Sequence, residues 1–143
     1  MMANPLPDPS TPFGERVLRR LREERVIWLT TVDSSGTPQP NPVWFFWDGE
    51  TLLVYNRPDA KRLQHIRRNP RVSLNFDSDG SGGDIVVLSG EARVNPDGAP
   101  ASMEAAYLEK YRAEIPEIDR TPESLAAEYS VALRISITKV RGF

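Results

Sequence analysis

Three prolines at alternating positions restrict the fold of this chain more than any other feature. Pro38, Pro40 and Pro42 lie in the segment 37–47, TPQPNPVWFFW, whose aromatic and β-branched residues favour a strand. Because residues two apart in a strand direct their N–H groups to the same edge, that edge lacks three successive donors. The sequence therefore predicts an edge strand, a bulged segment, or an edge that faces something other than a strand.

Two roles are open for the edge that carries the prolines. An exposed edge without donors resists pairing with other chains, which protects a protein against aggregation. Alternatively, the edge forms a backbone rim against which a planar polar ring docks. The opposite edge keeps the N–H and C=O groups of Gln39, Asn41 and Val43 and can pair normally. The residues of this strand do not decide between the two roles.

Short strand patterns separated by turn signals fill much of the remaining chain. The Asp-Gly pair at 48–49 is a strong hairpin signal, so we expect residues 26–56 to form a three-stranded antiparallel meander. Gly90 lies within another strand pattern and indicates a bulge or the close approach of another backbone. The expected strands are 26–32, 37–47, 51–56, 72–76, 85–95 and 131–140, and the expected helices are 11–24, 60–69, 101–114 and 122–129.

These patterns predict a mainly β (α+β) protein. Six mostly antiparallel strands suggest a closed or nearly closed barrel, with helices covering its open parts. A length of 143 residues favours one domain, which we expect over residues 11–143, after a flexible proline-rich arm over 1–10.

Composition excludes several classes of function. The chain has no cysteine and a single histidine, so it has no thiolate nucleophile, and we expect neither a metal site nor a Ser-His-Asp triad. Its net charge of −2 does not suit a nucleic-acid-binding protein. Its apolar runs are too short to cross a bilayer, and its N-terminus lacks the order of a signal peptide. We expect a cytoplasmic protein that binds neither nucleic acid nor membrane.

One short segment, YNRPDAKRLQHIRRNP at 55–70, gathers five Lys and Arg residues and the histidine. Arg67 and Arg68 come at the end of the expected helix, where cations suit the helix dipole. Lys61 and Arg62 come at its start, where cations oppose the dipole unless an anion compensates them. The sequence therefore predicts a phosphate seat at Lys61 and Arg62.

The chain that leads into this helix strengthens the phosphate hypothesis. A strand ends at Tyr55 and Asn56, and a loop then reaches the helix start at Ala60. Asn56 and the loop backbone can donate hydrogen bonds to an anion, and Arg57 can add a bidentate fork. His65 lies one turn after Lys61, and we interpret it as a packing or surface residue.

The segments GTPQPNPVWFFWDG and DAKRLQHIRRNPRV resemble the flavin-binding split β-barrel superfamily, whose namesake is pyridoxamine 5′-phosphate oxidase. In that family a Ser-Arg-Lys motif, eight to ten residues before an Asn-Pro, holds the flavin phosphate. Arg62, Lys61 and Ala60 lie eight, nine and ten residues before Pro70, so the two cations match in swapped order. Ala60 and Asn56 stand where the family has serine and threonine. The details look most similar to the actinobacterial branch that uses the deazaflavin coenzyme F420.

The resemblance implies a six-stranded antiparallel split β-barrel with a few flanking helices, usually a homodimer with the cofactor at the interface. The F420 tail carries a phosphodiester and several glutamates, which would explain an additional cation at Arg57. The implied cofactor-binding residues are Gln39, Pro40, Asn41, Pro42, Val43, Tyr55, Asn56, Arg57, Ala60, Lys61 and Arg62.

The resemblance also implies an oxidoreductase that transfers a hydride from reduced F420 to a small organic substrate. Because the cofactor carries the chemistry, no catalytic side chain is assigned. Two alternatives stay open: an FMN-dependent oxidase or reductase of the same fold, and a non-catalytic protein that binds or stores a cofactor. Haem binding is disfavoured because the single histidine, His65, lies beside the proposed phosphate seat.

Overall fold

The proline-bearing strand lies at an edge of the sheet. The computed structural model, which describes residues 5–95 and 103–143, places β2 (Pro38–Val43) beside β1 (Ile27–Val32) and beside no other described strand. The two strands are antiparallel, with Ile27 opposite Val43 and Val32 opposite Pro38. The edge that lacks N–H donors thus carries no partner strand, which confirms the edge strand predicted from the prolines.

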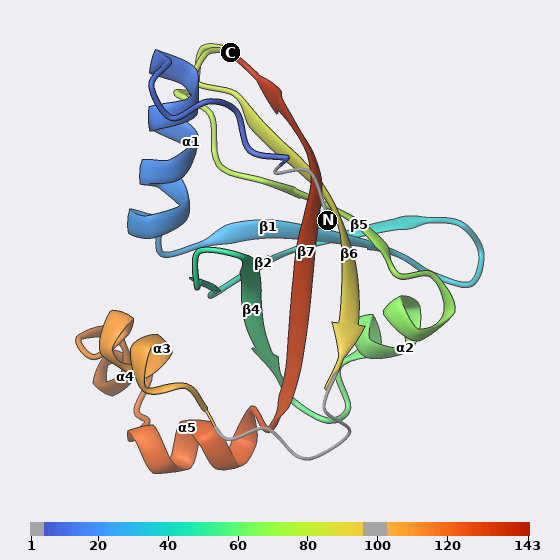
Figure 1. Ribbon diagram of the computed structural model, residues 1–143. Coiled ribbons are helices and arrows are strands. Elements are labelled where there is room, and N and C mark those ends of the chain that lie inside the picture. The colour runs from blue at the N-terminus through green and yellow to red at the C-terminus, as the bar shows by residue number, and fades with distance from the viewer. Residues whose placement is uncertain (1–4, 96–102) are drawn as a thin grey trace.

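Seven strands form one antiparallel sheet in the order β2-β1-β5-β6-β7-β4-β3. The first and last strands of this order are separated in the chain only by Trp44 and Phe45. The sheet therefore curls until its two edges come close together, and it forms a half-barrel (Figure 1). The remaining strands are β3 (Phe46–Trp47), β4 (Thr51–Asn56), β5 (Arg71–Asn75), β6 (Val86–Val94) and β7 (Val131–Gly142).

The fold class is as predicted, but the strand count of six and the three-stranded meander over 26–56 are wrong. The expected strand over 37–47 is broken at Trp44 and Phe45 into β2 and β3, which gives seven strands. The Phe45 N–H donates to Tyr111 Oη at 2.8 Å, and the Phe45 carbonyl accepts from Lys110 Nζ at 2.7 Å. Side chains thus satisfy the backbone of Phe45 where a neighbouring strand would do so in an unbroken sheet. As a result β2 pairs with β1, and β3 pairs with β4.

Helices cover the ends of the curled sheet. Figure 1 shows α1 at one end and α3, α4 and α5 grouped at the other, with α2 beside β6. Thr11 caps α1 by accepting a hydrogen bond from the Gly14 N–H. The expected helix over 101–114 contains α3 and the first residue of α4, while its residues 101–102 lie outside the described residues. The helices are α1 (Pro12–Glu23), α2 (Lys61–Arg68), α3 (Ala105–Lys110), α4 (Glu114–Glu117) and α5 (Pro122–Glu128).

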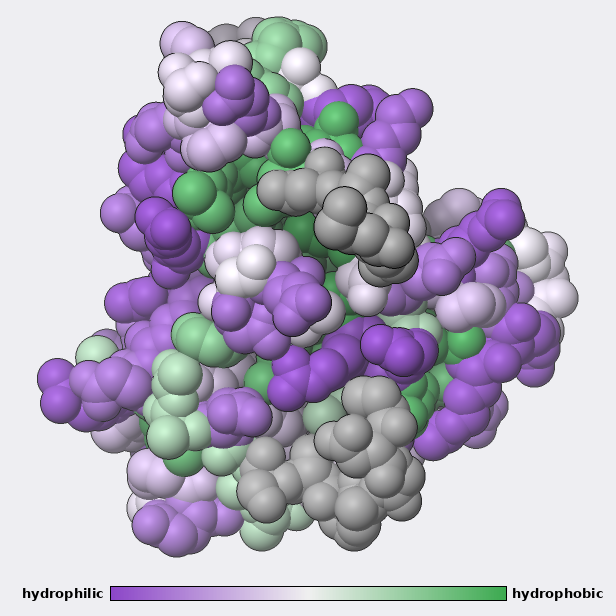
Figure 2. Space-filling view, in the orientation of Figure 1, coloured by the Kyte–Doolittle hydropathy of each residue, from purple (hydrophilic) through white to green (hydrophobic). Residues whose placement is uncertain are grey.

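Two apolar clusters stabilise this arrangement. The main cluster joins the inner face of the sheet to α1 and α2. The second packs Leu53 and Tyr55 of β4 against Tyr107, Ile115 and Leu125 of α3, α4 and α5. Figure 2 shows mostly hydrophilic side chains on the face in view, with hydrophobic ones between α1 and the strands. Of the arm expected over 1–10, Leu6 packs against the main cluster, and residues 1–4 lie outside the described residues.

Gly90 permits a close approach between the backbones of β6 and β7. The pairing of β6 with β7 shifts register between Ser89 and Gly90, as a bulge does. A Cβ atom at position 90 would lie 2.7 Å from the Ser136 carbonyl oxygen. Both observations confirm the prediction of a bulge or close approach.

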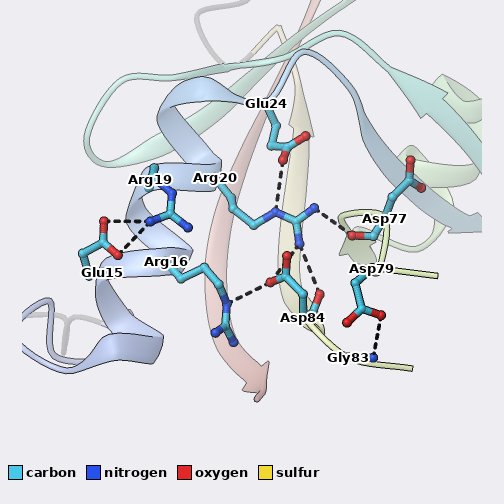
Figure 3. A network of polar contacts seen from close by, with 9 residues as sticks. All are labelled: Glu15, Arg16, Arg19, Arg20, Glu24, Asp77, Asp79, Gly83 and Asp84. Carbon is cyan, nitrogen blue, oxygen red and sulfur yellow. Dashed lines mark hydrogen bonds and ion pairs between the residues drawn. The ribbon is translucent and has the colours of Figure 1, made fainter. Parts of the chain in front are cut away.

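A buried arginine fixes α1 to the loop after β5. Arg20 is 8% exposed, and its guanidinium donates to the carbonyl oxygens of Asp77 and Asp84 and to the Glu24 carboxylate (Figure 3). The guanidinium also lies 4.9 Å from the centre of the Phe76 ring. Every side of this cation therefore meets an acceptor or a ring, which makes its burial favourable.

Candidate functional site

A hollow of about 480 Å³ lies between β2 and the start of α2. We call it the basic hollow. Five of the residues predicted to bind a cofactor line it together: Gln39, Asn41, Ala60, Lys61 and Arg62. The structure thus brings the second strand and the start of the helix to one place, although 19 positions separate Asn41 from Ala60 in the sequence.

The start of α2 is open to an anion. Ala60 occupies the N-cap position and has no side chain that could accept a hydrogen bond from the helix. No acidic residue lies in the first turn, while Lys61 and Arg62 both do. The positive end of the helix dipole and two cations are therefore adjacent, with no carboxylate of α2 to compensate them.

Arg62 carries the clearest sign of a missing partner. Its Nε and Nη1 atoms are buried and have no hydrogen-bond partner among the described residues. Burial lowers the pKa of the Arg62 guanidinium, and nearby Tyr129 acts in the opposite direction. Buried donors without acceptors are unfavourable, and native proteins rarely keep them without a reason. An anionic group entering the hollow would supply the missing acceptors.

Three further residues line the basic hollow and were not predicted: Thr31, Asp33 and His65. A hydrogen bond of 2.9 Å joins Thr31 Oγ1 to His65 Nδ1. Asp33 accepts from Gln39 Nε2 at 3.0 Å, and hydrogen bonds from the Thr37 backbone and from Gln39 lower the pKa of its carboxyl. These contacts fix the histidine and the glutamine beside the two cations.

Tyr55, Asn56 and Arg57 do not line the basic hollow. Asn56 is 0% exposed, and its amide donates to the carbonyls of Val54 and Val131 within the sheet. The Tyr55 hydroxyl accepts a hydrogen bond from the Glu104 N–H, at 2.8 Å. Arg57 forms an ion pair with Glu128, and its guanidinium lies over the Tyr129 ring. In this structure the three side chains join β4 to β7, α3 and α5.

A second cavity of about 320 Å³, which we call the aromatic hollow, adjoins the first at Arg62. Pro42 and Val43 of β2 line it, and so do Trp44 and Tyr55. Pro40, on the exposed part of β2, lines neither hollow. The predicted residues on β2 therefore divide between the two hollows, with Gln39 and Asn41 in the basic one.

Comparison with known proteins identifies the family. Residues 13–143 match the family model described as pyridoxamine 5′-phosphate oxidase. The chain belongs to the pyridoxamine 5′-phosphate oxidase family. The described fold agrees with this membership, because the solved structures of similar fold include one described as a putative pyridoxamine 5′-phosphate oxidase from Lactobacillus delbrueckii.

Individual relatives show the range of proteins built on this fold. General stress protein 26 of Bacillus subtilis is 31% identical over 83 residues, which span 57% of this chain and 59% of that relative. A structure described as an F420 reductase is 24% identical and covers 86% of this chain and 94% of its own, with a TM-score of 0.64. The heme storage protein HutZ of Vibrio cholerae is 15% identical and covers 90% and 93%, with a TM-score of 0.62. At identities of 24% and 15%, the F420 reductase structure and the HutZ structure show that they share the fold of this chain.

Two features are absent from the part of the chain that the structure describes. Within residues 5–95 and 103–143, no helix combines the length and the apolar character that a bilayer crossing requires. Over the same two ranges, histidine, aspartate and glutamate side chains nowhere gather in threes where they could hold a metal ion.

Proposed function

We propose that this protein is an oxidoreductase that binds coenzyme F420 in the basic hollow and transfers a hydride from its reduced form to a small organic substrate. The observation that carries the proposal is the partly buried Arg62 guanidinium, whose Nε and Nη1 atoms have no partner among the described residues, beside the uncapped start of α2. A phosphate or phosphodiester group would satisfy both features at once.

The residues of the basic hollow fit such a ligand. Lys61, Arg62 and the backbone N–H groups at the start of α2 would hold the phosphate, because Ala60 offers no hydroxyl and the amide of Asn56 is used within the sheet. Gln39 and Asn41 offer polar side chains along β2 for the remainder of the cofactor. When bound, reduced F420 would supply a hydride, and the substrate would gain that hydride together with one proton.

FMN is the second candidate for the same hollow. The family match favours it, since the namesake of the family is a flavin enzyme. The absence of the serine and threonine hydroxyls at Ala60 and Asn56, together with the similarity to a structure described as an F420 reductase, supports F420 instead. A cofactor-storage protein is the third candidate, and the similarity to a heme storage protein supports it.

Titration of the purified full chain with F420 and with FMN, followed by fluorescence anisotropy, tests the proposal. We expect F420 to bind more tightly, and Arg62→Ala to weaken binding about 30-fold, which corresponds to about 2 kcal/mol for lost charge-assisted hydrogen bonds. Arg67→Ala is the matched control on the same helix, and we expect it to change affinity by less than about threefold.

Three results would contradict the proposal. Tight FMN binding without F420 binding would assign the hollow to FMN. Equal losses in Arg62→Ala and Arg67→Ala would mean that the segment acts through a diffuse charge and holds no phosphate seat. F420 binding without oxidation of reduced F420 by any of a broad set of enones, quinones and tetrapyrroles would favour storage.

We also propose that the protein is a homodimer with its cofactor sites at the interface, the arrangement that the family resemblance implies. Light scattering coupled to size-exclusion chromatography tests this proposal directly. A mass near 16.1 kDa, that of one chain, would contradict it.

A further inference from the structure

The single histidine of the chain lines the basic hollow, and the proposed function leaves it without a role. We propose that His65 is a third anion ligand of this hollow, held in place by Thr31 and active in its protonated form, so that the hollow binds anions more tightly as pH falls. The inference rests on the proposed function, because it adds a residue to the phosphate seat. It does not depend on which cofactor supplies the anion.

A hydrogen bond fixes the orientation of the His65 ring. Thr31 of β1 is 1% exposed, and its Oγ1 atom lies 2.9 Å from His65 Nδ1. Nδ1 is therefore occupied, whereas no described residue hydrogen-bonds the other ring nitrogen, Nε2. Because the side chain is half-buried and lines the basic hollow, Nε2 is the nitrogen that is available to a ligand there.

His65 extends the group of cations at the start of α2. It follows Lys61 by four residues, so the two side chains lie on the same side of the helix, and Arg62 lines the same hollow. In an imidazolium both ring nitrogens donate, whichever tautomer the neutral ring adopts. With Nδ1 directed to Thr31, protonation therefore gives the hollow a charged N–H donor at Nε2, and such donors form the stronger hydrogen bonds to anions.

The other charged side chains that line the basic hollow keep their charge near neutral pH. Asp33 lies close enough for its charge to interact with that of His65. Hydrogen bonds from the Thr37 backbone and from Gln39 lower the pKa of the Asp33 carboxyl, so it stays ionised. Lysine and arginine side chains ordinarily remain protonated in this range, whereas imidazole is the group that ordinarily titrates in it.

The strands β1 and β6, which pack against α2, place no further titratable side chain beside His65. β1 contains none. In β6, Glu91 and Arg93 are exposed and flank the buried Ala92, so they point to the opposite face of the sheet. Arg68 follows on α2 itself, but it is exposed and, as an arginine, keeps its charge. A change in anion affinity near neutral pH should therefore report on His65.

Nuclear magnetic resonance of the isotope-labelled full chain, titrated with sodium sulfate, tests the inference. Sulfate keeps its own charge over the range used, and titration with chloride at matched ionic strength corrects for screening. From the backbone amide signals, we expect sulfate to bind about fivefold more tightly at about pH 6 than at about pH 8. Because the chain has one histidine, the imidazole signals belong to His65, and they should respond to sulfate at the lower pH.

Three variants distinguish a specific ligand from a diffuse charge. His65→Gln should lose the pH dependence of sulfate binding. Thr31→Val should reduce it to about twofold, because the ring loses the contact that orients it. The matched control is the double variant Gln64→His, His65→Gln, which moves the histidine to an exposed neighbouring position outside the hollow. We expect this double variant to behave as His65→Gln does.

The outcomes separate the role of His65 from the proposed function. Equal sulfate affinity at both pH values, or a double variant that keeps the wild-type pH dependence, would overturn the inference. Absence of sulfate binding by a protein that binds F420 would also overturn it and would leave the proposed function intact. Sulfate binding with the expected pH dependence, by a protein that does not bind F420, would support the role of His65 and overturn the proposed function.

Discussion

Two arginines, the buried Arg20 and the partly buried Arg62, each project from a helix that packs on the sheet. They differ in whether the chain supplies acceptors for the buried guanidinium nitrogens. The guanidinium of Arg20 meets the Glu24 carboxylate, two loop carbonyls and the Phe76 ring. The guanidinium of Arg62 has two buried nitrogens that meet no acceptor among the described residues. Burying a cation is costly in both places, but only at Arg20 does the chain itself compensate the cost. The comparison separates an arginine that stabilises the fold from one that is available to a ligand.

Arg20→Met should cause the largest loss of stability. The substitution leaves the carbonyls of Asp77 and Asp84 without a donor, and we expect the free energy of unfolding to fall by about 3 kcal/mol. Urea denaturation followed by circular dichroism measures the change. Arg19→Met is the matched control, because Arg19 is exposed on the same helix and, among the described residues, pairs only with Glu15. Similar losses at both positions would contradict the role given to Arg20.

Lys61→Met should weaken F420 binding less than Arg62→Met does. Lys61 lies at the same helix start, but it is exposed, so its attraction for a phosphate is screened by water and salt. We expect a loss of about 1 kcal/mol, or about fivefold, which shrinks as salt is raised. Titrations at low and high salt measure both quantities. A Lys61 effect larger than that of Arg62 would shift the anion seat to the solvent side of the helix.

Lys110 is intermediate between Arg20 and Arg62, because it is partly buried and has one hydrogen-bond acceptor. Its titration should have the smallest effect on stability. Its Nζ donates to the Phe45 carbonyl and lies 3.7 Å from the centre of the Phe45 ring, and burial lowers its pKa from 10.5 to about 8. Between these two values the unfolded chain holds more protons than the folded one, so stability should increase as pH rises through this window. Because the side chain is partly exposed, we expect a gain of at most about 1 kcal/mol. The gain should be absent in Lys110→Met, and a gain of equal size in that variant would assign it to other groups.

The parts of the fold that depend on neighbouring residues in sequence could be predicted. The alternating prolines indicate an edge strand, and Gly90 indicates the bulge, because both are properties of the local backbone. The break at Phe45 could not be predicted, because its backbone partners, Tyr111 and Lys110, lie more than sixty positions away and reach it only through the fold. The same break turned the expected meander into two separate hairpins.

The candidate site follows the same division. Lys61 and Arg62 could be identified because cations at a helix start conflict with the dipole of that same helix. Tyr55 and Asn56 turn into the sheet and its covering helices because β4 pairs with β7, a contact between distant segments. His65 joins the basic hollow because Thr31 of β1 binds its ring, and no pattern in the sequence links these two residues.

The central claim is that Arg62 is kept for a ligand at the expense of stability. Unfolding free energies of the wild type and of Arg62→Met, each with and without F420, test it most directly. Without F420 we expect Arg62→Met to be at least as stable as the wild type, by up to about 1 kcal/mol, because it removes buried donors without partners. With F420 the order should reverse, because ligand binding stabilises the wild type more strongly. A variant that is less stable without F420, or that gains as much from F420 as the wild type does, would contradict the claim.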